Sequence, residues 1–233
     1  MLDINLEAVR TNAIEAQLGE RGAAIVEGLL PKSTCEALAA TFEENDMFRS
    51  TVTMERHGFG RGRYRYFAYP LPQVLTELRL HLYPALVPIA NAWVKAMGSS
   101  AAYPPRLEDF LATCREAGQA RPTPLILKYE AGDYNCLHQD LYGEHAFPLQ
   151  MAILLSDRSS FSGGEFVLTE QRPRRQSRAE VVPLERGDAV IFAVNERPVQ
   201  GSRGTYRVRH RHGVSTVRSG TRLTLGIIFH DAA

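Results

Sequence analysis

The hydrophobic pattern of the chain changes its period near residue 123. Before that point, apolar residues recur every three or four positions, as on one face of a helix. The helices that this spacing predicts cover residues 3–19, 72–97 and 106–117. Between the first two, residues 23–30 are typical of a strand, and Ser33 with Glu36 forms a capping box that predicts a helix ending near residue 44.

After residue 123, short runs of aliphatic and β-branched residues alternate with Gly-rich turns, which predicts a series of strands. The strands are expected at 124–130, 149–155, 164–168, 180–184, 189–193, 206–209 and 222–229. Because no helix separates these runs, they favour an antiparallel sandwich or jelly roll in an α+β protein. We expect one domain over 1–233, with 1–122 as mainly helical support and 123–233 as the jelly-roll core.

Composition excludes several classes of protein. The 233 residues are 44% hydrophobic and 23% charged, as in a soluble globular domain. The sequence contains no run of about 18 apolar residues, so no membrane span is expected. The chain does not open with the pattern of a signal peptide, and its three widely spaced cysteines do not suggest a disulfide framework. A cytoplasmic location is the simplest expectation.

Positive charge is concentrated late in the chain. Residues 171–222 contain twelve arginines and four acidic residues, whereas the net charge of the whole chain is only +1. Arginine is well suited to binding phosphate, although a solvated loop would also explain the pattern. We expect the arginine-rich stretches 171–178 and 197–211 to flank the mouth of the barrel.

A second basic segment lies near residue 60, where arginines alternate with aromatic rings. Its candidate substrate-binding residues are Arg61, Arg63, Tyr64, Arg65 and Tyr66. Basic groups beside rings are what an unstacked base requires, but an ordinary hairpin with an aromatic core face would show the same pattern.

Two candidate metal ligands follow the strand expected at 124–130, and a third lies far downstream. His138 and Asp140 are two residues apart, so on an extended strand they face the same side. His212 would complete a set of two histidines and one carboxylate, although His210 competes for the same role. Such a set leaves three positions of an octahedron open, which suits non-haem Fe(II). Taken alone, His138 and Asp140 would also fit a solvated turn.

Three further residues could bind an anion beside this metal. Arg222 follows His212 by ten residues, which leaves room for one turn and a neighbouring strand. Its guanidinium could hold a carboxylate in a bidentate manner, and Thr224 lies on the same face of that strand. Tyr129 precedes His138 on the preceding strand and offers a phenol.

This ordered set resembles the Fe(II)- and 2-oxoglutarate-dependent dioxygenases. The resemblance implies a double-stranded β-helix fold and catalysis with Fe(II), 2-oxoglutarate and O₂. It also implies that His138, Asp140 and His212 hold iron and that Arg222, Thr224 and Tyr129 bind 2-oxoglutarate. Residues 163–166, GGEF, resemble the hairpin that follows the first ligand strand in that family.

The resemblance leaves the substrate open. Tyr129 to Gly132 is similar to the AlkB-like enzymes that demethylate alkylated bases, which predicts DNA repair on damaged or single-stranded nucleic acid. The chain departs from that branch at Leu127 and Ile228, where AlkB-like enzymes often have Asn and Arg. The sequence His212-Gly-Val214 is similar to prolyl hydroxylases, which act on protein or peptide. The same residues would also suit a small-molecule hydroxylase, or a metal-binding jelly-roll sensor module without turnover.

Overall fold

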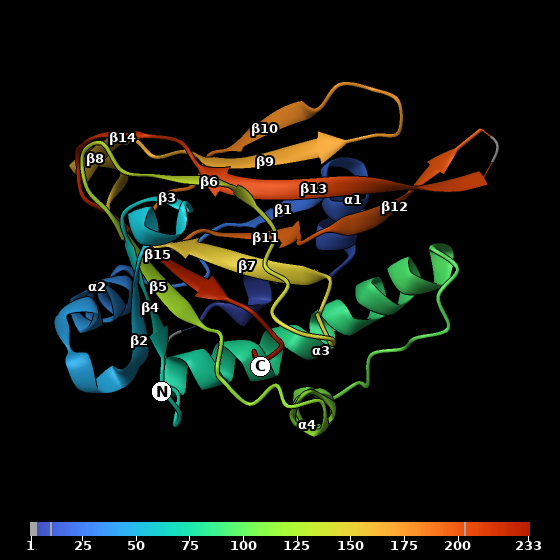
Figure 1. Cartoon of the computed structure of the whole chain (residues 1–233), viewed down its shortest axis with the longest axis horizontal. Helices are drawn as coiled ribbons and strands as arrows, with labels where there is room; N and C mark the ends of the chain where they lie inside the picture. The colour runs from blue at the N-terminus through green and yellow to red at the C-terminus, as the bar shows by residue number, and fades with distance from the viewer. Residues whose placement is uncertain (1–3, 10, 203) are drawn as a thin grey trace.

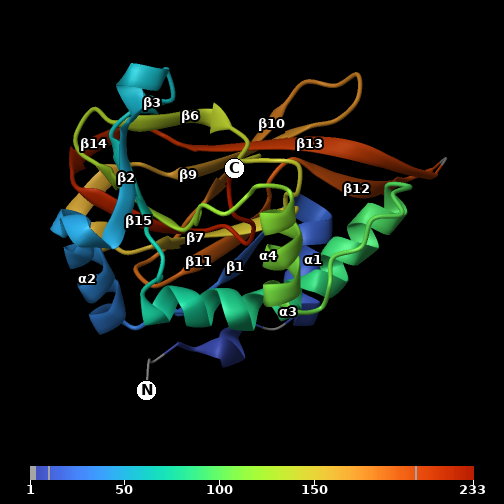
Figure 2. The same ribbon diagram turned by 60° about the horizontal axis from the view of Figure 1, so that its bottom comes forward.

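A computed structural model describes residues 4–9, 11–202 and 204–233 of the chain. Two antiparallel sheets face each other, and helices cover the outer face of the larger one (Figures 1 and 2). The larger sheet has the strand order β1-β11-β7-β15-β5-β4-β2. The smaller has the order β10-β9-β13-β6-β3, with β12 paired to β13, and β8 and β14 form a separate pair.

The strands of the larger sheet come from both parts of the chain. They are β1 (Ala23–Val26), β2 (Phe48–Thr53), β4 (Arg63–Phe67), β5 (Leu125–Tyr129), β7 (Leu149–Leu154), β11 (Ala189–Ala193) and β15 (Arg222–Ile227). Residues before 123, expected mainly as helical support, therefore also supply three strands of this sheet. The predicted α+β jelly roll is confirmed.

The smaller sheet carries most of the late, arginine-rich sequence. Its strands are β3 (Gly60–Arg61), β6 (Tyr134–His138), β9 (Phe166–Gln171), β10 (Arg178–Val182), β12 (Glu196–Gly201) and β13 (Gly204–Val214). The separate pair is β8 (Phe161–Gly163) and β14 (Val217–Gly220). The run predicted at 206–209 is thus the middle of an eleven-residue strand.

In the described residues, four helices and several short 3₁₀ turns complete the fold. The helices are α1 (Thr11–Arg21), α2 (Lys32–Ala40), α3 (Gln73–Ala96) and α4 (Leu107–Glu116). The 3₁₀ turns are Leu6–Ala8, Thr41–Glu43, Asn45–Met47, Met54–His57 and Arg158–Ser160. No helix in the described ranges is long and apolar enough to cross a membrane.

The helix predictions hold better for the later two helices than for the earlier two. Both α3 and α4 lie where the sequence places them. The helix expected at 3–19, which also includes residues outside the described part, is instead a 3₁₀ turn followed by α1. The capping box is wrong, because α2 already begins at Lys32 after Pro31, and Ser33 therefore lies inside the first turn.

Every residue of β7 is buried, but successive side chains belong to two different cores. On β7, Met151 and Ile153 pack in the large cluster that also contains the apolar face of α3. Their neighbours Ala152 and Leu154 pack in a second cluster with Phe166. Because successive residues of a strand face opposite sides, the second cluster lies between the two sheets. The same inner side of β7 carries Gln150, which faces the candidate site.

Candidate metal centre and cosubstrate pocket

Three side chains from β6, β13 and the loop after β6 converge between the sheets. His138 ends β6 and is paired in register with His212 on β13, while Asp140 lies two residues beyond the strand. One donor atom from each of the three lies within 4.8 Å of the others. His212 Nε2 is 3.2 Å from Asp140 Oδ2, and His138 Nε2 is 3.5 Å from Asp140 Oδ1.

Neighbouring groups orient these donors. His138 Nδ1 lies 2.8 Å from the carbonyl oxygen of Cys136, so its protonated nitrogen faces the strand and Nε2 faces the other two donors. The Asp140 carboxylate accepts hydrogen bonds from the Tyr142 hydroxyl at 2.5 Å and from Gln150 Nε2 at 2.8 Å. Such partners fix the direction in which a ligand presents its lone pairs.

The protonation states suit a metal. Burial alone would raise the pKa of Asp140, but the hydrogen bond and charge of His212 and the charge of His138 hold that pKa well below its usual range. Burial, together with the charge of His138, lowers the pKa of His212. At neutral pH the site therefore offers an ionised carboxylate and a neutral buried imidazole. Two histidines and one carboxylate with open positions are the donor set of non-haem Fe(II), so these residues fit that ion.

A cavity of about 330 Å³ adjoins this group, and the predicted anion-binding residues line it. Arg222 on β15 is paired in register with Tyr129 on β5, and its guanidinium carbon lies 5.7 Å from the centre of the Tyr129 ring. The guanidinium donates a hydrogen bond to the Thr224 hydroxyl. The Tyr129 hydroxyl is buried and has no hydrogen-bond partner among the described residues.

Arg222 differs from two other arginines that are buried to a similar degree. Arg79 is 3.1 Å from Asp231, and Arg197 is 2.6 Å from Glu170. Among the described residues, no carboxylate lies within 4.0 Å of Arg222, although its side chain is only 2% exposed. Burial lowers its pKa to about 10. A buried cation without an anion favours an anionic ligand, and the orphaned Tyr129 hydroxyl points to the same conclusion. The pocket therefore fits the distal carboxylate of 2-oxoglutarate.

The GGEF stretch is not the predicted hairpin, because β8 before it pairs with β14 and β9 after it pairs with β10 and β13. Its second glycine makes room for this arginine. Gly164 has φ +64°, and a Cβ atom there would lie 2.9 Å from Arg222 Cδ. Any larger residue at this position would therefore have to displace the arginine or adopt a strained backbone.

His210 lies outside the group of donors. Its Nε2 accepts a hydrogen bond of 3.0 Å from Arg197 Nε, and the ring packs against the backbone at Gly22 after α1. Arg197 also donates to the carbonyl oxygens of Gly19 and Glu20. His210 thus belongs to a buried polar cluster that joins α1 to the smaller sheet.

The predicted substrate residues of β3 and β4 separate into three groups. Tyr64 lines the cavity. The Tyr66 ring packs edge-on against the Tyr64 ring, with 5.4 Å between the two ring centroids. Arg65 is buried and donates to the carbonyl oxygen of Phe42 and to Asn45 Oδ1, which makes it a structural residue of the fold. Arg61 and Arg63 are exposed.

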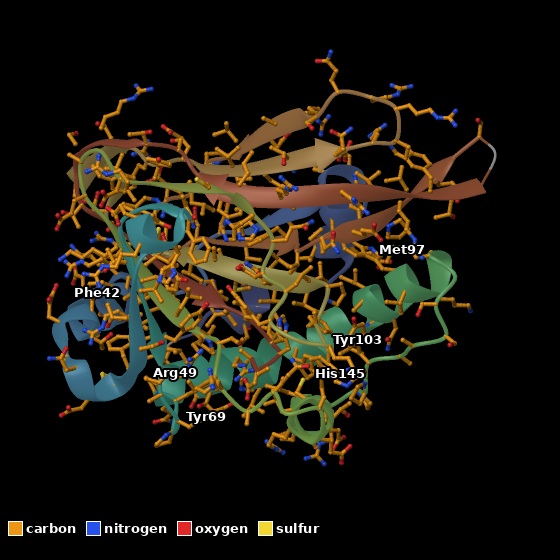
Figure 3. All side chains as sticks on the ribbon, viewed as in Figure 1. Phe42, Arg49, Tyr69, Met97, Tyr103 and His145 are labelled. Atoms are coloured by element: carbon orange, nitrogen blue, oxygen red, sulfur yellow. The ribbon has the colours of Figure 1, made fainter. Side chains whose placement is uncertain are left out.

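The expectation that the arginine-rich stretches flank the mouth is wrong. None of their described arginines lines the cavity, and Arg203 lies outside the described residues. The β12–β13 hairpin projects away from β3 and β14 (Figure 1). Arg207 donates instead to Glu196 Oε2 and to the carbonyl oxygen of Met97, which Figure 3 places at the far end of α3. The eight residue-to-residue steps from Gly204 to His212 span about 26 Å on a strand, so a residue that is continuous in sequence with a metal ligand need not lie near the metal.

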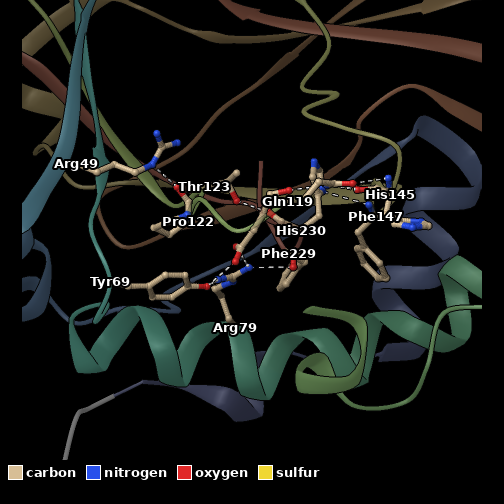
Figure 4. Close-up of polar contacts among 11 residues, drawn as sticks. Arg49, Tyr69, Arg79, Gln119, Pro122, Thr123, His145, Phe147, Phe229 and His230 are labelled. Atoms are coloured by element: carbon tan, nitrogen blue, oxygen red, sulfur yellow. Dashed lines mark hydrogen bonds and ion pairs between the residues drawn. The ribbon is translucent and has the colours of Figure 1, made fainter. Parts of the chain in front are cut away.

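Sequence reasoning did not identify Tyr142 and Gln150. Gln150 had a detectable signal, because it is a polar residue within the apolar run LQMAIL. Tyr142 follows Asp140 by two residues, but its position depends on a loop held by distant partners. In that loop, His145 and Phe147 bond to Gln119 and His230 (Figure 4).

Comparisons with known proteins show which family this chain resembles. Residues 62–232 match the model of the Oxygenase-NA family, described as oxygenases catalysing oxidative methylation of damaged DNA. The uncharacterized Mycobacterium tuberculosis protein Rv2227 is 51% identical over 168 residues, 72% of each chain.

Solved structures share the fold at low sequence identity. A 2OG-Fe(II) oxygenase family protein from Burkholderia pseudomallei superposes with a TM-score of 0.56 at 17% identity, covering 96% of this chain and 92% of that one. A Pseudomonas putida prolyl-4-hydroxylase gives 0.53 at 14% identity, covering 96% and 100%. The predicted enzyme class is confirmed, and the predicted cofactors Fe(II), 2-oxoglutarate and O₂ agree with it. The chain is thus a member of the Oxygenase-NA family of oxygenases.

Proposed function

We propose that this oxygenase removes methyl groups from alkylated bases in nucleic acid by oxidising them. In the overall reaction, an N–CH₃ group, O₂ and 2-oxoglutarate give N–CH₂OH, succinate and CO₂. The N–CH₂OH group then breaks its C–N bond to release formaldehyde, and the base nitrogen regains a proton. The family description, which names damaged DNA, supports this substrate class.

The residues of the chain have separate roles in this proposal. His138, Asp140 and His212 would hold iron, and Arg222, Thr224 and Tyr129 would hold 2-oxoglutarate. Iron with 2-oxoglutarate would supply the oxidising power for an unactivated C–H bond. Tyr142 and Gln150 keep the Asp140 carboxylate in a fixed orientation. The apolar walls, which include Leu127 and Phe192, exclude water from the reacting group.

Aromatic and basic residues at the cavity favour nucleic acid over peptide as the substrate. The segment Met54–Arg61 and the loop after β6 both contribute residues to the cavity lining, which includes the rings of Phe59, Tyr64 and Tyr142. Arg56 and Arg61 stand exposed on the same segment as Phe59. Aromatic faces beside cations are what an unstacked base and its phosphates require.

The test is turnover with Fe(II), 2-oxoglutarate and O₂ on a single-stranded oligonucleotide carrying one N-methylated adenine or cytosine. We expect succinate, formaldehyde and an oligonucleotide lighter by one methylene, in equal amounts. The unmethylated oligonucleotide and the His212→Ala variant are the controls. A product on proline-containing peptides, with none on the methylated oligonucleotide, would overturn the proposal in favour of peptide hydroxylation.

A further inference from the structure

Large apolar side chains stand in solvent around the mouth of the cavity. Phe59 is 48% exposed and Leu137 is 46% exposed, and both line the cavity. We call these two residues the lip. Tyr134 and Leu141, at 37% and 48% exposed, are chain neighbours of lining residues, whereas the other exposed large hydrophobic side chains of the described part lie on other elements, at Tyr69, Leu80 and Val181. Clustered exposed apolar surface marks a binding site more often than scattered residues do.

The backbone holds the lip in place. The carbonyl oxygen of Phe59 accepts from the Cys136 amide at 2.9 Å, and the Phe59 amide donates to the Met54 carbonyl oxygen at 3.2 Å. Gly60 has φ +126°, and a Cβ atom there would lie 2.4 Å from the Tyr134 carbonyl oxygen. The close approach of β3 to β6 therefore requires glycine. Phe59 immediately precedes β3, which forms the edge of the smaller sheet beside β6 (Figure 1).

The charged residues near the lip favour an anionic ligand. Arg56 and Arg61 are exposed on either side of Phe59, and only Glu55, 3.8 Å from Arg61, opposes them among the ion pairs of the described segment. The His57 ring stacks on the Phe59 ring at 5.3 Å with 22° between the planes. Phe59 thus already stacks with a planar ring, and the segment Met54–Arg61 that carries it has two exposed arginines and one acidic residue, Glu55.

We propose that the lip binds the nucleobase that neighbours the one being oxidised, with Phe59 as the stacking residue. The proposal rests on the proposed function. When one base enters the cavity, the strand places the next base at the mouth, where it loses its former stacking partner. An exposed, rigid aromatic surface compensates that loss at small entropic cost. The phosphates of the same nucleotides then lie near Arg56 and Arg61. Binding at the lip therefore favours a single strand over an isolated nucleoside.

A double-mutant cycle tests this contact. The Mn(II)-loaded full chain, with 2-oxoglutarate and without O₂, is titrated into a fluorescent methylated single strand and into the same strand with abasic sites flanking the methylated base. We expect Phe59→Ala to weaken binding of the complete strand about tenfold but to leave binding of the abasic strand nearly unchanged. Phe59→Trp should restore the affinity.

Val181→Ala is the matched control, because Val181 is 55% exposed on β10 and should not affect either strand. A melting temperature equal to that of the parent protein shows that Phe59→Ala still folds, and Phe59→Leu replaces it if it does not. If Phe59→Ala weakens the binding of both strands equally, or of neither, the proposal that the lip binds the neighbouring base is refuted. The wild-type turnover assay separates the two proposals. If the wild-type protein demethylates the strand but Phe59→Ala does not selectively weaken binding of the complete strand, only the proposal for the lip is refuted. If the wild-type protein oxidises no methylated strand, the proposed function is refuted.

Discussion

Replacing Arg222 by methionine should weaken 2-oxoglutarate binding and, at the same time, stabilise the ligand-free protein. The side chain is 2% exposed and, in the described structure, lacks a carboxylate partner. Burial lowers its pKa from 12.5 to about 10, so the folded protein disfavours the charged form. At about 1.36 kcal/mol per pKa unit, this costs about 3 kcal/mol. Because the folded pKa is the lower one, the cost is complete below pH 10 and is relieved only as the pH rises further.

Methionine keeps the apolar stem and removes the charge. The lost hydrogen bond to Thr224 offsets about 1 kcal/mol of the gain, so a net stabilisation of about 1–2 kcal/mol is expected. For a chain of this size, that corresponds to a rise in Tm of about 2–8 °C. For the ligand, truncating one partner of a buried charge pair costs about 2–5 kcal/mol, which is about 30-fold to several thousandfold in Kd.

The assay combines calorimetric titration of 2-oxoglutarate into the Mn(II)-loaded protein with thermal melts of the ligand-free protein. Arg197→Met is the matched control, because Arg197 is equally buried but lies 2.6 Å from Glu170. Removing it takes one of two arginine partners from the buried Glu170 carboxylate, which keeps Arg172, and also removes the bonds to Gly19 and Glu20. Arg197→Met should therefore destabilise the fold and leave 2-oxoglutarate affinity unchanged. If Arg222→Met binds 2-oxoglutarate within about threefold of the parent, the reasoning from its unpaired charge is refuted.

Three further predictions concern the metal ligands and His210. His212→Ala should abolish metal binding and turnover, whereas His210→Ala should keep metal binding, as measured by Mn(II) titration; the reverse result would move the ligand to His210. Tyr142→Phe removes a donor to Asp140 and should weaken Co(II) binding about tenfold and alter its visible spectrum, and unchanged values would show that Gln150 suffices. Burial lowers the pKa of His210 to about 4, so between pH 6.5 and 4 the unfolded chain binds more protons than the folded one. The free energy of unfolding should therefore fall by about 3 kcal/mol as the pH is lowered from 6.5 to 4. Denaturant unfolding measured across this pH range should show a smaller change for His210→Gln.

The residues of the candidate site could be predicted where strand geometry alone brings them together. Arg222 and Tyr129 are partners in one antiparallel register, and His138 faces His212 in another. In each pair the alternation of a strand decides the face, and this alternation is visible in the sequence. The same alternation distinguishes His212 from Arg211 and Gly213 as a candidate ligand. It does not distinguish His212 from His210, which faces the same side of the strand. Only the packing of α1 and Arg197 on the smaller sheet shows that His210 belongs to the fold.

Charge was a poor guide to position. The late arginines suggested a basic mouth, but Arg197 is buried, Arg207 and Arg209 share Glu196, and Arg172 bonds to Glu170. Net charge along a sequence does not show which ion pairs form across strands. The surface at the mouth owes its basic and aromatic character to the short segment around Phe59, whose importance depends on β3 being held against β6.

The helical half of the chain also determines the geometry of the metal site. The Gln119 amide, just after α4, donates to the carbonyl oxygens of His145 and Asp231 and accepts from the His145 amide (Figure 4). Asp231 in turn pairs with Arg79 of α3. Gln119 is fully buried, and a Cβ atom at Gly143 would lie 2.4 Å from it, so the loop after Asp140 packs directly on this amide. That loop carries Tyr142, whose hydroxyl bonds to Asp140. The direction of the carboxylate therefore depends on contacts with α3, with the segment after α4 and with the residues that follow β15, which explains why a three-residue metal motif needs the rest of the chain.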